Sequence, residues 1–102
     1  MMVGATFAMY AALNKNARYD PVRGFQAVNL AATTPLVFAV SSAMPTKTLR
    51  EFTTLAKAQP GAMHYASPGN GTPQHLAMEL FKLNAGINVL HVPYKSTAAA
   101  TQ

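Results

Sequence analysis

The chain contains no cysteine, and only three of its 102 residues are acidic. Without cysteine it has neither a disulfide framework nor a thiolate nucleophile, so cysteine usage leaves the cellular compartment open. No stretch approaches the roughly 18 uninterrupted apolar residues of a transmembrane helix. The apolar start MMVGATFAMYAAL follows no basic segment and precedes no persuasive cleavage site, which disfavours a secretory signal peptide.

The scarcity of carboxylates argues against an enzyme. Only Asp20, Glu51 and Glu79 are acidic, and of these Glu51 fits a helix cap and Glu79 fits a helix surface. No nucleophile, base and orienting acid can therefore be assembled into a catalytic triad. We predict no catalytic residue and no cofactor.

The three histidines do not indicate a metal site. His64, His75 and His91 show no paired ligand spacing, and no cysteine accompanies them. His64 and His91 fall within predicted strands, where packed or edge positions are expected. His75 follows a glycine-rich loop at the start of a predicted helix, which favours a local polar role.

Basic residues outnumber acidic residues by eight to three, which gives a formal net charge of +5. Such a charge attracts polyanions, but the lysines and arginines are spread along the chain and form no cluster interleaved with aromatic residues. We therefore predict no nucleic-acid binding, and an electrostatic field that favours small anions.

Half of the residues are hydrophobic, as in a folded core, and the length suits one small domain or a piece of a larger one. Residues 1–14 predict a strand that leads into a short helix, and residues 19–25 predict a turn. The apolar segment 27–42 predicts two strands, or one strand bent at Pro35, because proline removes a hydrogen bond from a sheet.

Two further helices are marked by their ends. Thr48-Leu49-Arg50-Glu51 matches a capping box and predicts a helix over 48–59. A second helix begins after Thr72 with proline at its first position, and Ala85-Gly86 closes it. The expected buried positions are Leu49, Phe52, Leu55 and Ala56 in the first helix, and Leu76, Ala77, Leu80 and Phe81 in the second.

Short apolar runs at 62–66 and 87–92 predict strands on either side of the second helix. Strands that alternate with helices imply right-handed crossovers and a parallel sheet. The predicted fold class is therefore α/β.

Two loops follow these strands, Ser-Pro-Gly-Asn-Gly-Thr at 67–72 and Pro-Tyr-Lys-Ser-Thr at 93–97. In an open parallel sheet, ligands bind beyond the carboxyl ends of the strands. Each loop leads into a helix N-terminus, whose unpaired amides and partial positive charge suit a carboxylate or phosphate. Gly69 and Gly71 would allow the backbone to approach a ligand, and Lys95 would add a charge. Such loops also serve merely to turn and cap, and residue types alone support both readings equally.

Four segments resemble one family in their order and spacing, from about residue 5 to residue 97: YDPVRGF, PLVFAVSSAMPTKTLREFTTLAKAQPG, YASPGNGTPQHLAMELFKLNAG and VLHVPYKS. They resemble the Bug family, the extracytoplasmic solute receptors of tripartite tricarboxylate transporters. The resemblance implies a periplasmic-binding-protein-like (Venus flytrap) fold and a periplasmic location. It also implies binding of small carboxylates, which such receptors deliver to the membrane subunits of a transporter.

The same resemblance implies a division of the chain. Residues 1–26 correspond to a remnant of the first domain, 27–42 to the segment that crosses between domains, and 43–102 to the first half of the second, ligand-binding α/β domain. This family carries glycine after Tyr-Lys where this chain has Ser96, which puts close backbone approach at the second loop in doubt. The implied ligand-binding residues are Ser67, Gly69, Asn70, Gly71, Thr72, His75, Tyr94, Lys95, Ser96 and Thr97, with Thr6 from the remnant of a first-domain loop.

We therefore expect a fragment, either excised or a truncated gene product, of a receptor for small carboxylates. The alternative is a truncated orphan paralogue that oligomerises without binding a ligand; an anion-binding enzyme domain is disfavoured by the missing acid and base residues. We also expect a homo-oligomer, because the strands and helices that would cover the sheet are absent. Residues 1–13 and 27–42 would then form most of the contact.

Overall fold

The computed structural model describes residues 1–101. Its secondary-structure elements are, in chain order, α1 (Ala5–Leu13), α2 (Leu49–Ala58), β1 (His64–Ser67), α3 (Pro73–Ala85), β2 (Leu90–Pro93) and α4 (Thr97–Ala100). Within the described residues no helix has the length and apolar character needed to cross a membrane.

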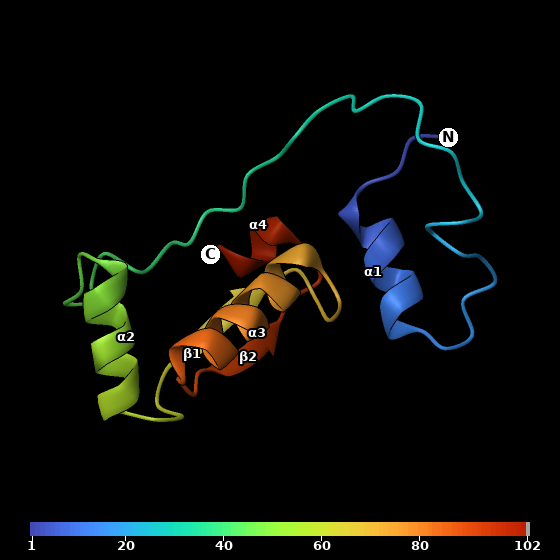
Figure 1. Cartoon of the computed structure of the whole chain (residues 1–102). Helices are drawn as coiled ribbons and strands as arrows, with labels where there is room; N and C mark the ends of the chain where they lie inside the picture. Colours follow the sequence, from blue (N-terminus) through green and yellow to red (C-terminus); the bar gives the residue numbers. More distant parts are fainter. Residues whose placement is uncertain (102) are drawn as a thin grey trace.

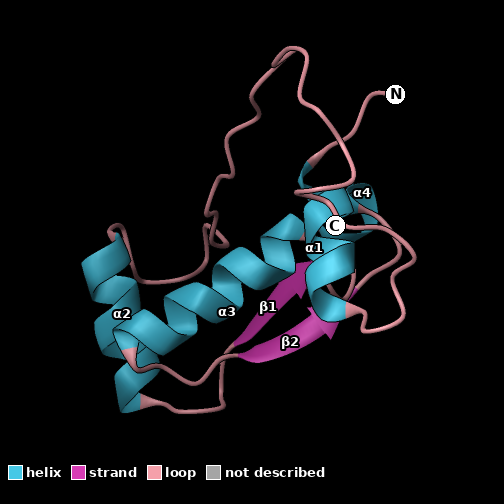
Figure 2. Ribbon diagram, turned by 45° about the vertical axis from the view of Figure 1, so that its right-hand side comes forward, coloured by secondary structure: helices cyan, strands magenta, loops and turns pink. Residues whose placement is uncertain are grey.

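Strands β1 and β2 form a two-stranded parallel sheet in which His64 lies opposite Leu90 and Ser67 lies opposite Pro93. Helix α3 makes the crossover between them and packs over the sheet (Figure 2). The α/β class with a parallel sheet is confirmed. Both strands begin two or three residues later than predicted. Met63 and Val89, which precede them, are buried in the core.

Segment 27–42 contains no strand, and this prediction is wrong. The segment runs as a long extended linker from the α1 region to α2 (Figure 1). An extended chain becomes a strand only when a neighbouring chain completes its hydrogen bonds, and here β1 and β2 pair with each other instead. Its apolar side chains are consequently exposed, Val28 at 97% and Val37 at 85%. Phe38 packs inward, with ring centroids 5.0 Å from Phe52 and 5.9 Å from Phe81.

The N-terminal residues form a helix without the predicted strand before it. Helix α1 is held by aromatic packing: the Phe7 and Tyr19 rings stack at 4.6 Å, and Phe25 meets Phe7 edge-on at 5.0 Å. The Tyr19 hydroxyl also donates to the Phe7 carbonyl oxygen at 2.7 Å. In the predicted turn, the Asp20 carboxylate accepts from the Arg23 and Val22 amides, which holds the pKa of Asp20 below its usual value.

The core lies where α2, α3 and the starts of both strands meet. It comprises Phe52, Ala56, Met63, Met78, Ile87 and Val89. In α3 the buried face is centred on Met78, with Phe81 and Ala85 packed beside it, a spacing of three and four residues. The predicted stripe was therefore wrong at Leu80, which is 59% exposed, and at Ala77.

The predicted helix ends are present. The Thr48 hydroxyl oxygen accepts from the Glu51 amide at 3.2 Å. The Glu51 carboxylate reaches one residue further back than in a reciprocal capping box, and accepts from the Lys47 amide at 2.7 Å. In α3 the Thr72 hydroxyl oxygen accepts from the His75 amide, and Gly86 ends the helix at a φ of 63°, in the left-handed region.

We predict that Thr48→Ala lowers the free energy of unfolding by about 1 kcal/mol, because the Glu51 amide loses its acceptor. Thr54→Ala is the matched control. Thr54 lies inside α2, its hydroxyl donates to the Arg50 carbonyl oxygen, and alanine is the better helix former there. Urea unfolding should show a lower free energy of unfolding for Thr48→Ala and no loss for Thr54→Ala. Equal effects would mean that α2 is held by packing alone.

Candidate functional site

The two loops predicted from the sequence lie side by side at the carboxyl ends of the strands. Both strand arrows point towards α1 and α4, at the N-terminal end of α3 (Figure 2). The loops touch directly, since the Tyr94 amide donates to the Ser67 carbonyl oxygen at 2.8 Å. A Cβ atom added to Gly69 would lie 3.6 Å from the Tyr94 carbonyl oxygen. Parallel pairing therefore produces one composite surface from two segments distant in sequence.

The first loop is closed by its own hydrogen bonds. The Gly69 amide donates to the Ser67 hydroxyl oxygen at 3.2 Å, and the Thr72 hydroxyl donates to the Gly69 carbonyl oxygen at 2.8 Å. The Gly71 amide donates to the His75 Nδ1 atom at 3.1 Å. Gly69 and Gly71 have φ values of 137° and 74°, which side chains disfavour. The loop thus has one defined backbone path.

Some backbone donors in and after this loop have no acceptor within residues 1–101. Within residues 1–101 the backbone N–H groups of Asn70 and Gln74 donate to no other group. Both lie at the N-terminal end of α3, where the helix dipole adds a partial positive charge. This end of α3 can therefore donate hydrogen bonds to a small anion.

The second loop adds a positive charge and an exposed aromatic side chain. Tyr94 is 41% exposed, and the Lys95 side chain is exposed next to it. The Ser96 hydroxyl oxygen accepts from the Ala99 amide at 3.2 Å and caps α4, which begins at Thr97. Ser96 therefore serves as a helix cap.

Thr6 does not join this surface as the resemblance implied. It lies in the first turn of α1, exposed, on a helix and not in a loop. Helix α1 approaches the loop by its opposite end, since a Cβ atom on Gly71 would lie 3.2 Å from the Leu13 Cδ1 atom.

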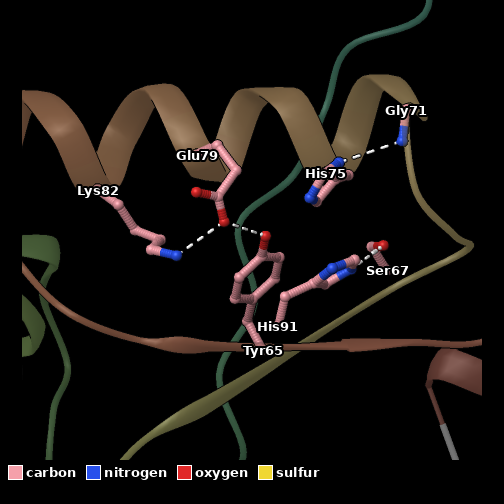
Figure 3. Close-up of polar contacts among 7 residues, drawn as sticks. All are labelled: Tyr65, Ser67, Gly71, His75, Glu79, Lys82 and His91. Atoms are coloured by element: carbon pink, nitrogen blue, oxygen red, sulfur yellow. Dashed lines mark hydrogen bonds and ion pairs between the residues drawn. The ribbon is translucent and has the colours of Figure 1, made fainter. Parts of the chain in front are cut away.

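Beneath α3, and directly behind the first loop, lies a polar cluster that sequence reasoning missed (Figure 3). The Tyr65 hydroxyl donates to the Glu79 Oε1 atom at 2.6 Å, and the Lys82 ammonium donates to the same oxygen at 2.7 Å. The Lys82 ammonium also lies 5.6 Å from the centre of the Tyr65 ring. Glu79 is therefore a bridge between helix and sheet.

The other half of the cluster is a stack of three rings. The His91 ring lies 4.7 Å from the Tyr65 ring and 4.2 Å from the His75 ring. The His91 Nε2 atom is 2.6 Å from the Ser67 hydroxyl oxygen. In the observed parallel register Tyr65 lies opposite His91. The predicted strands 62–66 and 87–92 alone do not fix this register, so no clear signal for the pair was present in the sequence.

The environment fixes the protonation of this cluster at neutral pH. Burial, and then the bond to Glu79, raises the pKa of Tyr65, so its hydroxyl remains a donor. Hydrogen bonds from Lys82 and Tyr65 lower the pKa of Glu79 and keep it ionised. Burial, and then the electrostatic influence of the neighbouring His75 side chain, lowers the pKa of His91, which is therefore neutral.

The close contact between Ser67 and His91 is structural, although it has the separation of a nucleophile and its base. Ser67 is only 1% exposed, and its hydroxyl is also engaged with the backbone of Gly69. Within residues 1–101 no carboxylate bonds to His91, and no group of three His, Asp or Glu side chains is placed to hold a metal ion.

A separate hollow of about 230 Å³ lies at the other end of the structure, between the linker and the start of α2. Its lining is largely apolar, and the Glu51 carboxylate already occupies that helix N-terminus. The hollow therefore does not offer the donors that the loop at 67–72 offers. Its lining residues are Phe38, Val40, Thr46, Lys47, Thr48, Leu49 and Phe52.

Comparison with known proteins places these features in context. The family described as the tripartite tricarboxylate transporter family receptor matches residues 1–102. The "UPF0065 protein in gbd 5'region" of Cupriavidus necator is 34% identical over 84 residues, which cover 82% of this chain and 26% of that protein. Protein BugT of Bordetella pertussis is 27% identical over 96 residues, which cover 94% of this chain and 29% of that protein.

A solved structure, R. palustris Rpa4515 with adipate, is similar to this chain with a TM-score of 0.58 and 28% identity. The similarity covers 59% of this chain and 20% of that one. The chain thus spans little more than a quarter of the two curated relatives above.

We predict that stability falls as the pH is lowered from 7.5 to 5, in part through His91. Its folded pKa lies below the ordinary value of 6.5, so the unfolded chain takes up the proton first and is stabilised by it. The contribution is complete above pH 6.5 and is lost as the pH falls towards the folded pKa. The free energy of unfolding should be measured with urea at several pH values. It should change less with pH for His91→Gln than for the wild type, and as in the wild type for His64→Gln, whose side chain is exposed. An unaltered pH dependence for His91→Gln would contradict the assignment.

Proposed function

This chain belongs to the tripartite tricarboxylate transporter family of receptors, and we propose that it supplies one wall of a cleft for small carboxylates. Membership confirms the Bug resemblance. The family and the similar solved structure are solute-binding receptors and not enzymes. The observation that carries the proposal is the loop at 67–72, which presents backbone donors and the α3 N-terminus at the carboxyl end of β1.

The choice of a carboxylate rests on charge and on one relative. The site combines a helix N-terminus with the exposed Lys95, and no carboxylate side chain of residues 1–101 lies in either loop. The similar protein from R. palustris is seen with adipate, a dicarboxylate. We propose that the ligand contacts come from the exposed parts of the two loops, with the backbone amides of Asn70 and Gln74 as donors beside Lys95. The buried Ser67 and the internally bonded amides of Gly69 and Gly71 shape the site instead. Thr6 is retained only as a residue that a rearranged α1 would bring in.

We also propose a division of the chain along the lines expected from the family. Residues 1–26 belong to a first domain, 27–42 cross between domains, and 43–102 begin a second domain. The supporting observation is that 27–42 is extended and packs mainly through Phe38. In the periplasm such a receptor would hand its ligand to the membrane subunits of the transporter.

We predict that adipate, titrated into the 102-residue chain, gives a calorimetric signal at low salt that weakens as salt is added. Lys95→Gln should weaken binding roughly two- to fivefold, as expected for the loss of one exposed charge. Lys57→Gln, which removes an exposed charge at the end of α2, is the control and should leave affinity unchanged.

The panel should also include acetate and citrate. Absence of both heat and thermal stabilisation across all three acids would favour the second candidate, a truncated orphan paralogue that oligomerises without a ligand. A specific observation supports that candidate: the exposed apolar side chains of segment 27–42 have no cover within residues 1–101.

We predict a homo-oligomer at micromolar concentration, because the extended segment 27–42 exposes apolar side chains and an unpaired backbone to which another chain can pair. Val37→Lys should shift the assembly towards monomer in light scattering, since lysine on an edge blocks pairing. Val22→Lys is the matched control, because Val22 is 82% exposed, close to the 85% of Val37, but lies in the turn at 19–25. A monomeric wild-type chain would overturn the prediction.

A further inference from the structure

We infer that His91, which lies on β2 outside both loops, is the positioning residue of the loop at 67–72 and sets the backbone at Gly69 and at Gly71. It reaches the first glycine through a hydrogen bond and the second through ring stacking (Figure 3). The consequence for ligand affinity rests on the proposed function; the effect on the loop itself does not.

The hydrogen-bonding route passes through Ser67. The His91 Nε2 atom lies 2.6 Å from the Ser67 hydroxyl oxygen, which is 3.2 Å from both the amide nitrogen and the carbonyl oxygen of Gly69. A hydroxyl has a single proton, so His91 decides where it goes. When Nε2 is unprotonated it accepts that proton, and the Ser67 oxygen is left to accept from the Gly69 amide.

This route is sheltered from water. Ser67 is 1% exposed and His91 is half-buried, so the Ser67 hydroxyl depends on protein groups for its hydrogen bonds. Without an acceptor at position 91, the Ser67 hydroxyl would donate to the Gly69 carbonyl oxygen, which is already within reach. That oxygen already accepts from the Thr72 hydroxyl at 2.8 Å, so the two hydroxyls would share its two lone pairs.

The stacking route passes through His75. The His91 ring lies between Tyr65 and His75, with planes tilted by 22° and 24°. The His75 Nδ1 atom accepts from the Gly71 amide, which requires that nitrogen to be unprotonated and the ring to keep its rotamer. Packing against His91 restricts that rotamer, so the Gly71 bond depends on a ring at position 91.

The two routes can be separated by substitution. His91→Phe retains a planar ring and removes the bond to Ser67. His91→Gln retains an amide group near the Nε2 position and removes the ring. His64, exposed on β1 and paired opposite Leu90, offers the controls His64→Phe and His64→Gln on the same sheet.

The first measurement is amide hydrogen exchange by NMR on the ¹⁵N-labelled 102-residue chain without ligand. His91→Phe should raise the exchange rate of the Gly69 amide about tenfold and leave Gly71 near its wild-type rate. His91→Gln should raise the exchange rate of the Gly71 amide about tenfold and leave that of Gly69 near its wild-type rate. Both His64 variants should leave both glycines unchanged. Equal acceleration of all amides, or no change at either glycine, would overturn the inference, because a purely structural residue would not separate the two.

The second measurement is adipate titration of the same proteins. Both His91 variants should bind about five- to tenfold more weakly than wild type, and the His64 variants equally well. Wild-type affinity in both His91 variants would overturn the link between loop position and binding. If the wild-type chain binds no adipate, the proposed function fails, whereas the exchange data still decide whether His91 positions the loop.

Discussion

The parallel register of β1 and β2 is the constraint on which the rest of the site depends. It sets Ser67 opposite Pro93, so the loops that follow the two strands begin at the same edge. It also sets Tyr65 opposite His91, so two rings face α3 together. A shift of the register by one residue would send these side chains to the other face and leave His75 and Glu79 of α3 without partners.

Gly69 and Gly71 have a different role in the structure from the one expected from the sequence. Both have positive φ, as the sequence indicated, but their amides turn inward, towards Ser67 and His75. Their lack of a side chain matters mainly towards the protein, because Gly69 passes close to the Tyr94 backbone and Gly71 close to Leu13. The backbone amides without an acceptor within residues 1–101 include those of Asn70 and Gln74. In this loop glycine therefore shapes the path of the chain, and its neighbours carry the donors.

Features that depend on a few adjacent residues were predictable from the sequence. The caps at Thr48 and Thr72 and the left-handed Gly86 follow from local chemistry. The failures all involve partners distant in the sequence. Segment 27–42 has the composition of strands, but a strand needs a neighbour and none pairs with it. The buried face of α3 depends on the core residues that other segments supply, such as Phe52 and Val89, and Met78 lies in this core whereas Leu80 does not. Glu79 does lie at the surface, with its side chain 37% exposed, but its bond to Tyr65 was not predicted because Tyr65 lies on another element.

The weak packing of the linker bears on how a two-domain receptor would work. Closing a cleft around a ligand requires a segment whose dihedral angles change without repacking a core. Segment 27–42 meets that condition, because Val28 and Val37 are exposed and Phe38 carries its aromatic contacts to the core. The loop at 67–72, in contrast, is tied to the sheet by Ser67 and to α3 by His75. Under the function proposed above, this combination would let the distance between the two walls of a cleft change while the donors on this wall stay in place.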